Sequence, residues 1–268
     1  MAKTFDTPPF HVLDRAAAEP FSVSEVICYF SGGKDALCTL DLCLSRFRRV
    51  VPVFMYYIPW LSFQEEMLRY AERRYSLSII RIPHWNLPEV LKAGVLRFPG
   101  QRTDNLRKLT IADTDRYLRS KTGVHWIASG EKCIDSVERN AMIKNNGGID
   151  AGRGRIWPIA HWSNQAVYSH LKRQQIPLPA EYKFKFAGGA KRSFGGRLWM
   201  DECVWLRDHY PEDWKKVLAM FPLAEAQIAR FNLRELEKSK AISAQKLAQH
   251  STTSAGAPNG EEESQVAN

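Results

Sequence analysis

The residues best suited to chemistry lie in one short segment, Ser31-Gly32-Gly33-Lys34-Asp35, which joins two glycines to a hydroxyl, an ammonium and a carboxylate group. An apolar run over residues 25–30 precedes this segment, and a helix is expected to follow it over residues 35–47. The start of a helix has unpaired N–H groups and partial positive charge, and glycines let an anion approach them. We therefore predict a phosphate-binding loop. The alternative is an ordinary strand–helix turn in which Asp35 favours the helix start.

Two later segments contain polar and charged residues at short spacing. One runs Trp126-Ile-Ala-Ser-Gly-Glu-Lys-Cys-Ile-Asp-Ser-Val-Glu-Arg139. The other runs Ile156-Trp-Pro-Ile-Ala-His-Trp-Ser-Asn-Gln-Ala-Val-Tyr168. In the second, Ser163 is the expected N-cap of a helix over residues 164–173, and Trp162 is expected to staple onto Val167.

In this order, the three segments resemble the phosphoadenosine phosphosulfate reductase family of the ATP pyrophosphatase superfamily, whose members are also called PP-loop proteins or adenine nucleotide α-hydrolases. The first segment is similar to the pattern S-G-G-x-D-S, the second to G-x-R-x-x-[DE]-S-x-x-R, and the third to P-I-x-x-W-[ST]-x-x-[DE]-V followed by I-P. The match spans roughly residues 25–185.

The resemblance implies a role for each matching residue. The nucleotide phosphates would be held by the loop residues Ser31, Gly32, Gly33, Lys34 and Asp35. The residues that would face the phosphates or sulfate from the fourth strand are Gly130, Lys132 and Arg139. Asp135 and Ser136 suit a ligand contact and a helix cap equally well. Of these residues, Lys34 and Asp35 are the candidates for a catalytic role.

The sequence departs from the family pattern at several positions. Ala36 replaces the usual serine, which costs about 1 kcal/mol for one neutral hydrogen bond and would not abolish binding. Lys132 stands where arginine is usual. The second strand is followed by Ile58-Pro-Trp-Leu-Ser, without the acidic and glycine residues common there in reductases.

The cysteines speak against reductase chemistry. None of the five (Cys28, Cys38, Cys43, Cys133 and Cys203) forms a C-x-x-C pair, so no disulfide framework, zinc ribbon or iron–sulfur cluster is expected. A sulfonucleotide reductase needs a nucleophilic thiolate near its C-terminus, and only Cys203 lies there. Its acidic neighbours should raise the thiol pKa, so we expect a buried helix residue.

The elements that must position these residues alternate between strands and helices. Strands are expected at residues 25–30, 50–57, 78–82 and 125–129, and helices at 35–47, 63–75 and 106–120, with Ser62 and Glu65 forming a capping box. This order predicts an α/β fold with a mostly parallel twisted sheet and helices on both faces. We divide the chain into an irregular lead-in (1–24), a nucleotide-binding domain (25–185), a basic loop with a helical extension (186–247) and a disordered tail (248–268).

The charge balance favours anionic partners. The 268 residues carry a formal charge of +9. A Gly-rich loop interleaves phenylalanines with the basic residues Lys183, Lys185, Lys191, Arg192 and Arg197, which suits nucleic acid. The alternatives are a loop that closes over the nucleotide and a solvated surface. No signal peptide or membrane span is apparent, so a cytoplasmic protein without membrane contact is expected.

The leading functional hypothesis is ATP-pyrophosphatase chemistry: adenylation of an acceptor, followed by sulfur or nitrogen transfer. The cofactor would be ATP with Mg²⁺, which Asp35 would hold through water, or phosphoadenosine phosphosulfate; no protein cluster of metal ligands is expected. The acceptor could be nucleic acid, the donor could be a sulfur-carrying protein, and homo-oligomerisation stays open. The alternatives are a reductase that uses Cys203 and a non-catalytic protein that binds nucleotide or nucleic acid.

Overall fold

The computed structural model describes residues 11–98, 100, 103, 105–184 and 200–254. The strands are β1 (Glu25–Tyr29), β2 (Arg49–Tyr56), β3 (Ile80–Pro83), β4 (Trp126–Ala128), β5 (Ile149–Asp150) and β6 (Arg155–Ile156). The helices are α1 (His11–Ala17), α2 (Lys34–Leu44), α3 (Ser62–Tyr75), α4 (Leu87–Lys92), α5 (Ile111–Thr122), α6 (Val137–Asn145), α7 (Asn164–Arg173), the 3₁₀ turn η1 (Ala180–Lys183), α8 (Met200–His209), α9 (Pro211–Met220) and α10 (Ala224–Ser254).

Within the described residues, the strands form one six-stranded sheet in the order β3-β2-β1-β4-β6-β5. Neighbouring strands are parallel except β5, which runs antiparallel to β6. The chain leaves β1 toward β2 and β3, then returns to place β4 on the other side of β1. In open α/β sheets, such a reversal of strand order leaves a crevice at the carboxyl ends of the strands, where ligands bind.

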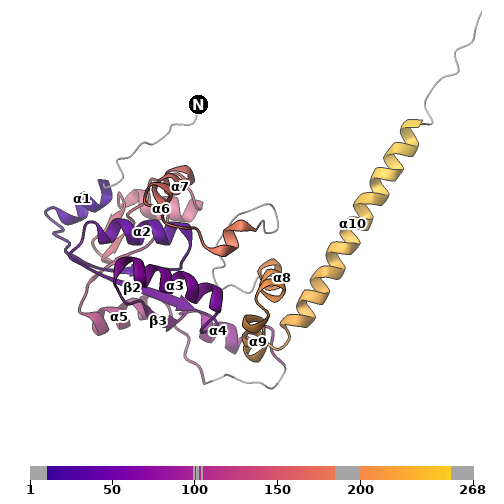
Figure 1. The fold of residues 1–268 in the computed structure, drawn as a ribbon, viewed down its shortest axis with the longest axis horizontal. Coiled ribbons are helices and arrows are strands. Elements are labelled where there is room, and N and C mark those ends of the chain that lie inside the picture. Colours follow the sequence, from indigo (N-terminus) through magenta and orange to yellow (C-terminus); the bar gives the residue numbers. More distant parts are fainter. Residues whose placement is uncertain (1–10, 99, 101–102, 104, 185–199, 255–268) are drawn as a thin grey trace, which may run out of the picture.

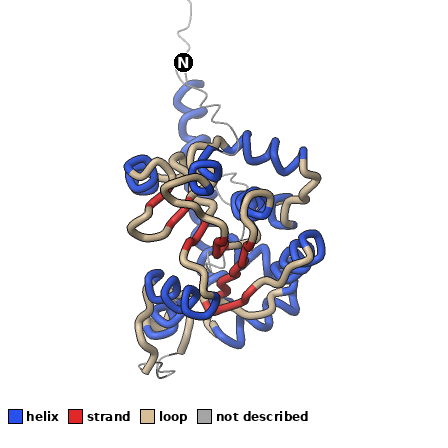
Figure 2. The backbone as a smooth tube through the Cα atoms, turned by 90° about the vertical axis from the view of Figure 1, so that its left-hand side faces the viewer, coloured by secondary structure: helices blue, strands red, loops and turns tan. Residues whose placement is uncertain are grey.

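Helices cover both faces of the sheet (Figures 1 and 2). Alternate residues of β1 belong to different buried clusters: Val26 and Cys28 pack with α2 on one face, and Ile27 packs with Leu118 of α5 on the other. The predicted α/β class, with a mostly parallel sheet between helices, is thus confirmed.

The C-terminal helices form a second buried cluster beside the sheet. Leu206, Trp214 and Phe221 of this extension pack with Tyr57 and Leu61, which follow β2. Among the α10 residues whose side chains the structure describes, Ile228 is the last that belongs to the buried core. Beyond that point α10 runs away from the α/β body (Figure 1).

Several predicted element boundaries were wrong. The capping box at Ser62 and Glu65 does not form: Ser62 is the first helical residue, and its N–H and hydroxyl both donate to Asp213 of α9. The helix expected over 106–120 begins at Ile111, because Thr110 and Asp113 make a reciprocal capping box there. Ser163 does cap α7, accepting from the N–H of Ala166.

Some elements were not predicted at all. Helix α4 and the short hairpin of β5 and β6 carry too little periodicity to be read from the sequence. Helix α10 continues to Ser254, into the segment 248–268 predicted to be disordered; residues 255–268 lie outside the described residues. No helix among the described residues is both long and apolar enough to cross a membrane.

A polar clamp joins three of the helices on the α2 face. The Asp41 carboxylate accepts from the Tyr75 hydroxyl at 2.9 Å and lies 2.8 Å from His170 Nε2. Burial disfavours the charged form of Asp41, but the hydrogen bonds from His170 and Tyr75 outweigh it and lower the pKa of this carboxyl. Asp41 on α2 therefore holds α3 and α7 together.

We predict that Asp41→Asn lowers the free energy of unfolding by about 1–3 kcal/mol at pH 7, because hydrogen bonds to a charged group are lost. The folded-state pKa lies below the unfolded value of about 3.9, so the stabilisation is complete above that pH and fades as pH falls through the folded-state pKa. Urea unfolding should show the difference from wild type shrinking toward pH 3.

The control is Asp14→Asn, which removes a carboxylate from the exposed ion pair with Arg46 and should cost less than about 0.5 kcal/mol. Equal losses in the two variants at pH 7 would contradict the clamp.

Candidate functional site

The phosphate loop leaves β1 and enters α2 as predicted. Gly32 has φ +79°, in the left-handed region that favours glycine, and Gly33 is the N-cap of α2 in extended conformation. Lys34 is the first helical residue, so the N–H groups of the first turn lie at the end of α2 that follows the carboxyl end of β1.

Lys34 is held by groups from three parts of the chain. Its Nζ donates to Asp35 at 2.5 Å and to Asn164 Oδ1 of α7 at 3.0 Å, and it lies 5.8 Å from the centre of the Tyr168 ring. Its backbone N–H donates to the Tyr182 hydroxyl at 3.2 Å. Burial lowers the pKa of Lys34, against the opposing effect of Asp35. The ammonium group is therefore fixed in place rather than free to rotate.

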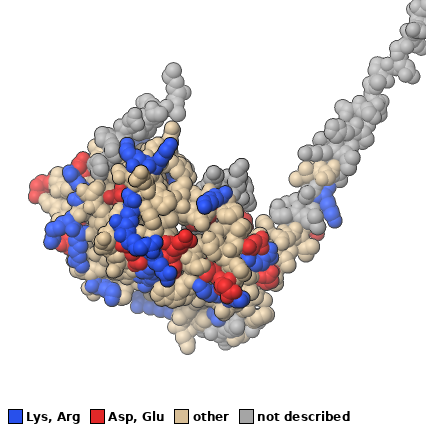
Figure 3. All heavy atoms as spheres, in the orientation of Figure 1, with Lys and Arg blue, Asp and Glu red and all other residues tan. Residues whose placement is uncertain are grey.

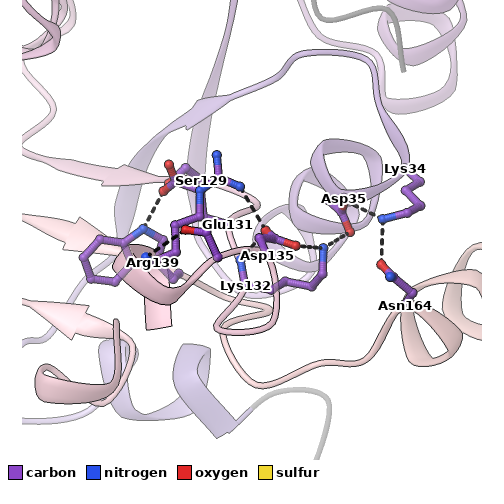
Figure 4. Close-up of polar contacts among 10 residues, drawn as sticks. Lys34, Asp35, Ser129, Glu131, Lys132, Asp135, Arg139 and Asn164 are labelled. Atoms are coloured by element: carbon purple, nitrogen blue, oxygen red, sulfur yellow. Dashed lines mark hydrogen bonds and ion pairs between the residues drawn. The ribbon is translucent and has the colours of Figure 1, made fainter. Parts of the chain in front are cut away.

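A row of alternating charges continues from Lys34 across the floor of the site (Figure 4). Lys132 Nζ is 2.6 Å from Asp35 Oδ1 and 3.1 Å from Asp135 Oδ1, and Arg139 closes the row 3.2 Å from the other oxygen of Asp135. Lys132 is completely buried. Its ammonium group, predicted to face the ligand phosphates, is instead engaged by two carboxylates.

Asp135 and Ser136 organise the loop after β4. Burial opposes ionisation of Asp135, but the backbone N–H and the charge of Lys132 outweigh it and lower the pKa of this carboxyl. The Ser136 hydroxyl accepts from the Arg139 N–H and so caps α6. Two roles were predicted for Ser136, a ligand contact and a helix cap, and in the structure it caps α6.

Gly130 lets this loop approach the start of α2. A Cβ atom at this position would lie 2.9 Å from the backbone carbon and oxygen of Asp35, and 3.1 Å from Thr39 Oγ1. Real Cβ atoms do not come so close to backbone, so only glycine fits without movement. A glycine is therefore required at position 130 on steric grounds.

A cleft of about 1140 Å³ opens beside these loops. The predicted site residues that line it are Ser31, Asp35, Gly130 and Arg139. The other predicted residues do not line it: Gly32, Gly33, Lys34, Lys132 and Ser136. Aromatic residues from the end of β3 complete one side: His84 stacks on Tyr57 at 4.4 Å between ring centres, and Trp85 follows it.

Sequence reasoning missed the opposite side of the cleft. Asp115, Arg116 and Arg119 of α5 line it, together with Tyr29 and Arg155 at the ends of β1 and β6. The spacing of the α5 residues by three and four places them on one helix face. That signal was present in the sequence, within the helix expected over residues 106–120.

Glu131 is another cleft residue that was not predicted. Its Oε2 accepts from the Ser129 hydroxyl at 2.9 Å and from Trp157 Nε1 at 2.7 Å. Both donors are neutral, whereas the cleft carboxylates Asp35, Asp115 and Asp135 are all paired with cations. Among the carboxylates lining the cleft, Glu131 is therefore the one without an ion pair in the described structure.

Cys203 is unsuited to nucleophilic attack. It lies completely buried in α8, within the second cluster, and does not line the cleft. Burial and the carboxylates of Glu202 and Asp201 raise the pKa of this thiol to about 12, so it is protonated at neutral pH.

The remaining predicted residues concern nucleic acid and metal. Lys183 is exposed at the end of η1; Lys185, Lys191, Arg192 and Arg197 lie outside the described residues. In the part of the chain that the structure describes, no three His, Cys, Asp or Glu side chains gather as metal ligands. The Asp35 carboxylate, predicted to hold Mg²⁺ through water, is 28% exposed and lines the cleft, and its two oxygens accept from Lys34 and Lys132.

We predict that Gly130→Ala destabilises the fold by about 1–3 kcal/mol, because the new methyl group must displace the backbone of Asp35. Gly152→Ala is the matched control, since its Cβ would meet only Asp150 Oδ1 at an ordinary 3.5 Å. Denaturant unfolding compares the two. A wild-type midpoint for Gly130→Ala would show that the close approach is not required.

Thiol labelling tests the burial of Cys203. Cys133 is partly exposed, whereas the other four cysteines are buried, so the native protein should react at a single thiol at pH 8. Cys133→Ser should then leave no fast-reacting thiol in the folded protein, and full reactivity should return in denaturant. Rapid labelling of Cys203 in the native chain would contradict its assignment as a core residue.

The chain resembles one curated protein, several solved structures and one family model. The chain is 29% identical over 171 residues to the uncharacterised protein MJ0066 of Methanocaldococcus jannaschii, which covers 60% of this chain and only 34% of that relative. The chain thus spans about a third of the relative's length.

Solved structures that resemble the chain include three nucleotide-related enzymes. One is a phosphoadenylyl-sulfate reductase from Candida auris, with a TM-score of 0.45 and 12% identity over 69% of this chain and 89% of that one. The second is an FMN adenylyltransferase from Candida glabrata in complex with ATP, with a TM-score of 0.42 and 19% identity over 65% of this chain and 54% of that one. The third is the U34-tRNA thiolase NcsA from Methanococcus maripaludis with its [4Fe-4S] cluster, with a TM-score of 0.42 and 12% identity over 80% of this chain and 77% of that one. These similarities are too low to support any argument about this chain's chemistry.

The decisive comparison is with a family model, the phosphoadenosine phosphosulfate reductase domain, which matches residues 25–188. This range holds the phosphate loop, the Gly130 loop and the start of α7, the three places where the site is built. The chain belongs to the phosphoadenosine phosphosulfate reductase family.

Proposed function

We propose that this protein binds an adenosine nucleotide in the cleft and activates an acceptor by adenylation, with release of pyrophosphate. The observation that carries the proposal is the contrast between the phosphate loop and Cys203. Ser31 and Asp35 of the loop line the cleft, and Lys34, held by Asp35 and Asn164, is the cation beside them. The only thiol downstream of the third motif is buried and has a pKa of about 12. This contrast supports nucleotide chemistry that needs no cysteine nucleophile.

The proposed reaction begins with attack by an acceptor oxygen on the α-phosphorus of ATP. The new oxygen–phosphorus bond forms as the bond to the bridging oxygen breaks, and pyrophosphate leaves with the electron pair. Lys34 and the loop N–H groups would stabilise the charge that develops on the leaving group. Sulfide from a carrier protein, or ammonia, would then displace AMP from the adenylated acceptor.

Glu131 would accept the proton that the acceptor hydroxyl loses. A general base must keep its affinity for a proton, and a paired cation would lower it. The contacts of Glu131 in the described structure are with the neutral Ser129 and Trp157, which orient the carboxylate without neutralising it.

Phosphoadenosine phosphosulfate is the second candidate for the nucleotide that the cleft binds.

Mg²⁺ would accompany ATP and supply charge neutralisation on the phosphates. Asp35 would hold it through water, and a sulfur- or nitrogen-donating partner would supply the second nucleophile. We place this activity in the cytoplasm.

The test is calorimetric titration of the full chain with ATP and with adenosine in the presence of Mg²⁺. Lys34→Ala should weaken ATP binding by about 10- to 100-fold, the worth of one charge-assisted contact, and leave adenosine binding unchanged. Gly33→Asp should do the same, because it brings a carboxylate to the anion site.

The control variant is Lys172→Ala, which removes an exposed lysine from the other end of α7 and should leave both affinities unchanged. Unaltered ATP binding by Lys34→Ala and Gly33→Asp would refute the site. Loss of phosphoadenosine phosphosulfate turnover on Cys203→Ser would favour the reductase alternative instead, and tight ATP binding without pyrophosphate release across acceptors would favour a non-catalytic role.

A further inference from the structure

We propose that the cleft contains a second anion site, formed by Arg116, Arg119 and Arg153, which binds a phosphate group of the acceptor. We call these three residues the arginine wall. The inference rests on the proposed function, because it identifies the acceptor of that reaction as a phosphate-bearing molecule.

The wall faces the phosphate loop across the end of the sheet. Helix α5 packs on one face of the sheet through Leu118, and α2 packs on the other through Leu37 and Leu40. Arg116 and Arg119 line the cleft from α5, and Arg153 lines it from the turn between β5 and β6. A ligand in the cleft would therefore be within reach of Ser31 and Arg139 as well as of the arginine wall.

Arg119 gives the wall a fixed frame. Its Nε donates to the carbonyl of His125 at 2.7 Å, and its Nη2 donates to the carbonyl of Arg153 at 2.5 Å. Both acceptors are neutral, so among the described contacts no carboxylate cancels the charge of Arg119. Gly154 has φ +60°, and a Cβ there would lie 2.7 Å from the His125 ring and 3.0 Å from Arg119 Nη2 of α5. The turn that carries Arg153 is thus seated tightly on α5.

The carboxylate inside the wall is already neutralised. Asp115 receives both of its ion-pair contacts from Arg155, at 2.7 and 2.6 Å, and a hydrogen bond from the Tyr29 hydroxyl at 2.5 Å. Burial and the nearby carboxylate raise the pKa of Tyr29, so the phenol remains a donor. Asp115 therefore does not repel an incoming anion.

Arg116 and Arg153 are free to change partners. Their side chains are 76% and 71% exposed, and their ion pairs are with Asp113 at 3.1 Å and Asp150 at 3.8 Å, which do not line the cleft. Exposed ion pairs contribute little, so a phosphate can replace either carboxylate at small cost. Guanidinium groups bind phosphate oxygens through two parallel hydrogen bonds, which suits them to this ligand.

The size of the cleft leaves room for this second group. Its 1140 Å³ exceeds the range of about 300–1,000 Å³ typical for one small ligand. The two exposed arginines are placed to follow a chain that continues outside the cleft, as a nucleic-acid strand would. Figure 3 shows Lys and Arg distributed over the surface with acidic groups between them, so the overall charge of +9 does not point to one exposed patch on that face. Because the two exposed guanidinium groups of Arg116 and Arg153 can each bind one phosphate of a repeating backbone, we assign the phosphate to a single-stranded polynucleotide.

The test compares Arg116→Ala/Arg153→Ala with Arg48→Ala/Lys215→Ala, a control pair of equally exposed cations that each contact one carboxylate. Binding of a 12-nucleotide single strand is measured by fluorescence anisotropy across a salt series. The wall variant should bind at least 10-fold more weakly, and the slope of log affinity against log salt should fall by about 1.4, as expected for two lost phosphate contacts. ATP binding should stay unchanged in both variants.

Three outcomes overturn the proposal or part of it. Equal losses of strand affinity in the two double variants would show that the arginine wall contributes only general surface charge. Loss of ATP binding in the wall variant would assign the arginines to the nucleotide itself. In the third outcome, the wild type binds inorganic phosphate but not the strand, and Arg116→Ala/Arg153→Ala loses phosphate binding. That outcome would support the phosphate site and reject the polynucleotide as its ligand. Failure of the proposed function is seen separately, because Lys34→Ala reports on ATP and not on the strand.

Discussion

The close approach of the Gly130 loop to the start of α2 is the constraint on which the site depends. At this contact the ammonium group of Lys132 is completely buried and meets the carboxylates of Asp35 and Asp135. A buried charge left without its partner costs several kcal/mol, so the three groups are stable only together. Their pairing is what fixes the phosphate loop against the end of β4.

The order of the strands explains why these loops meet. Strands β1 and β4 are neighbours although a long stretch of chain separates them, and both end at the same edge. Strands β2 and β3 lie on one side of β1 and β4 lies on the other, so the strand order reverses between β1 and β4. Such a reversal leaves the carboxyl ends of these two strands open. The phosphate loop, the Gly130 loop and the side of α5 therefore surround one cleft, and the C-terminal helices pack elsewhere, on the residues that follow β2.

Local signals in the sequence predicted most of the α/β body. The phosphate loop, the Ser163 cap and the parallel strands each follow from neighbouring residues. What could not be predicted depends on residues far apart in the chain. The capping box at Ser62 gave way to Asp213, 151 residues away, because a tertiary partner replaced the local one.

The site follows the same division. Its residue types were readable, and the family pattern gave Gly130 and Arg139 their place. The orientation of Lys34 was not readable, since Asn164 and Tyr182, which hold it, come from other elements. The burial of Lys132 could not be predicted for the same reason, since a lysine in a polar motif suggests a ligand contact. The packing of this loop against α2 brings Lys132 into ion pairs with Asp35 and Asp135.

The row of charges from Lys34 to Arg139 also has a thermodynamic meaning. Each member shares a partner with the next, so drawing Arg139 away from Asp135 strengthens the hold of that carboxylate on Lys132 and loosens Lys132 from Asp35. Asp35 is then left to Lys34 alone, at the far end of the row. A ligand that drew Arg139 out of the row would therefore change the surroundings of Asp35 on α2, and linkage would make such an effect reciprocal. The ion pairs thus form one continuous link between the start of α2 and the start of α6.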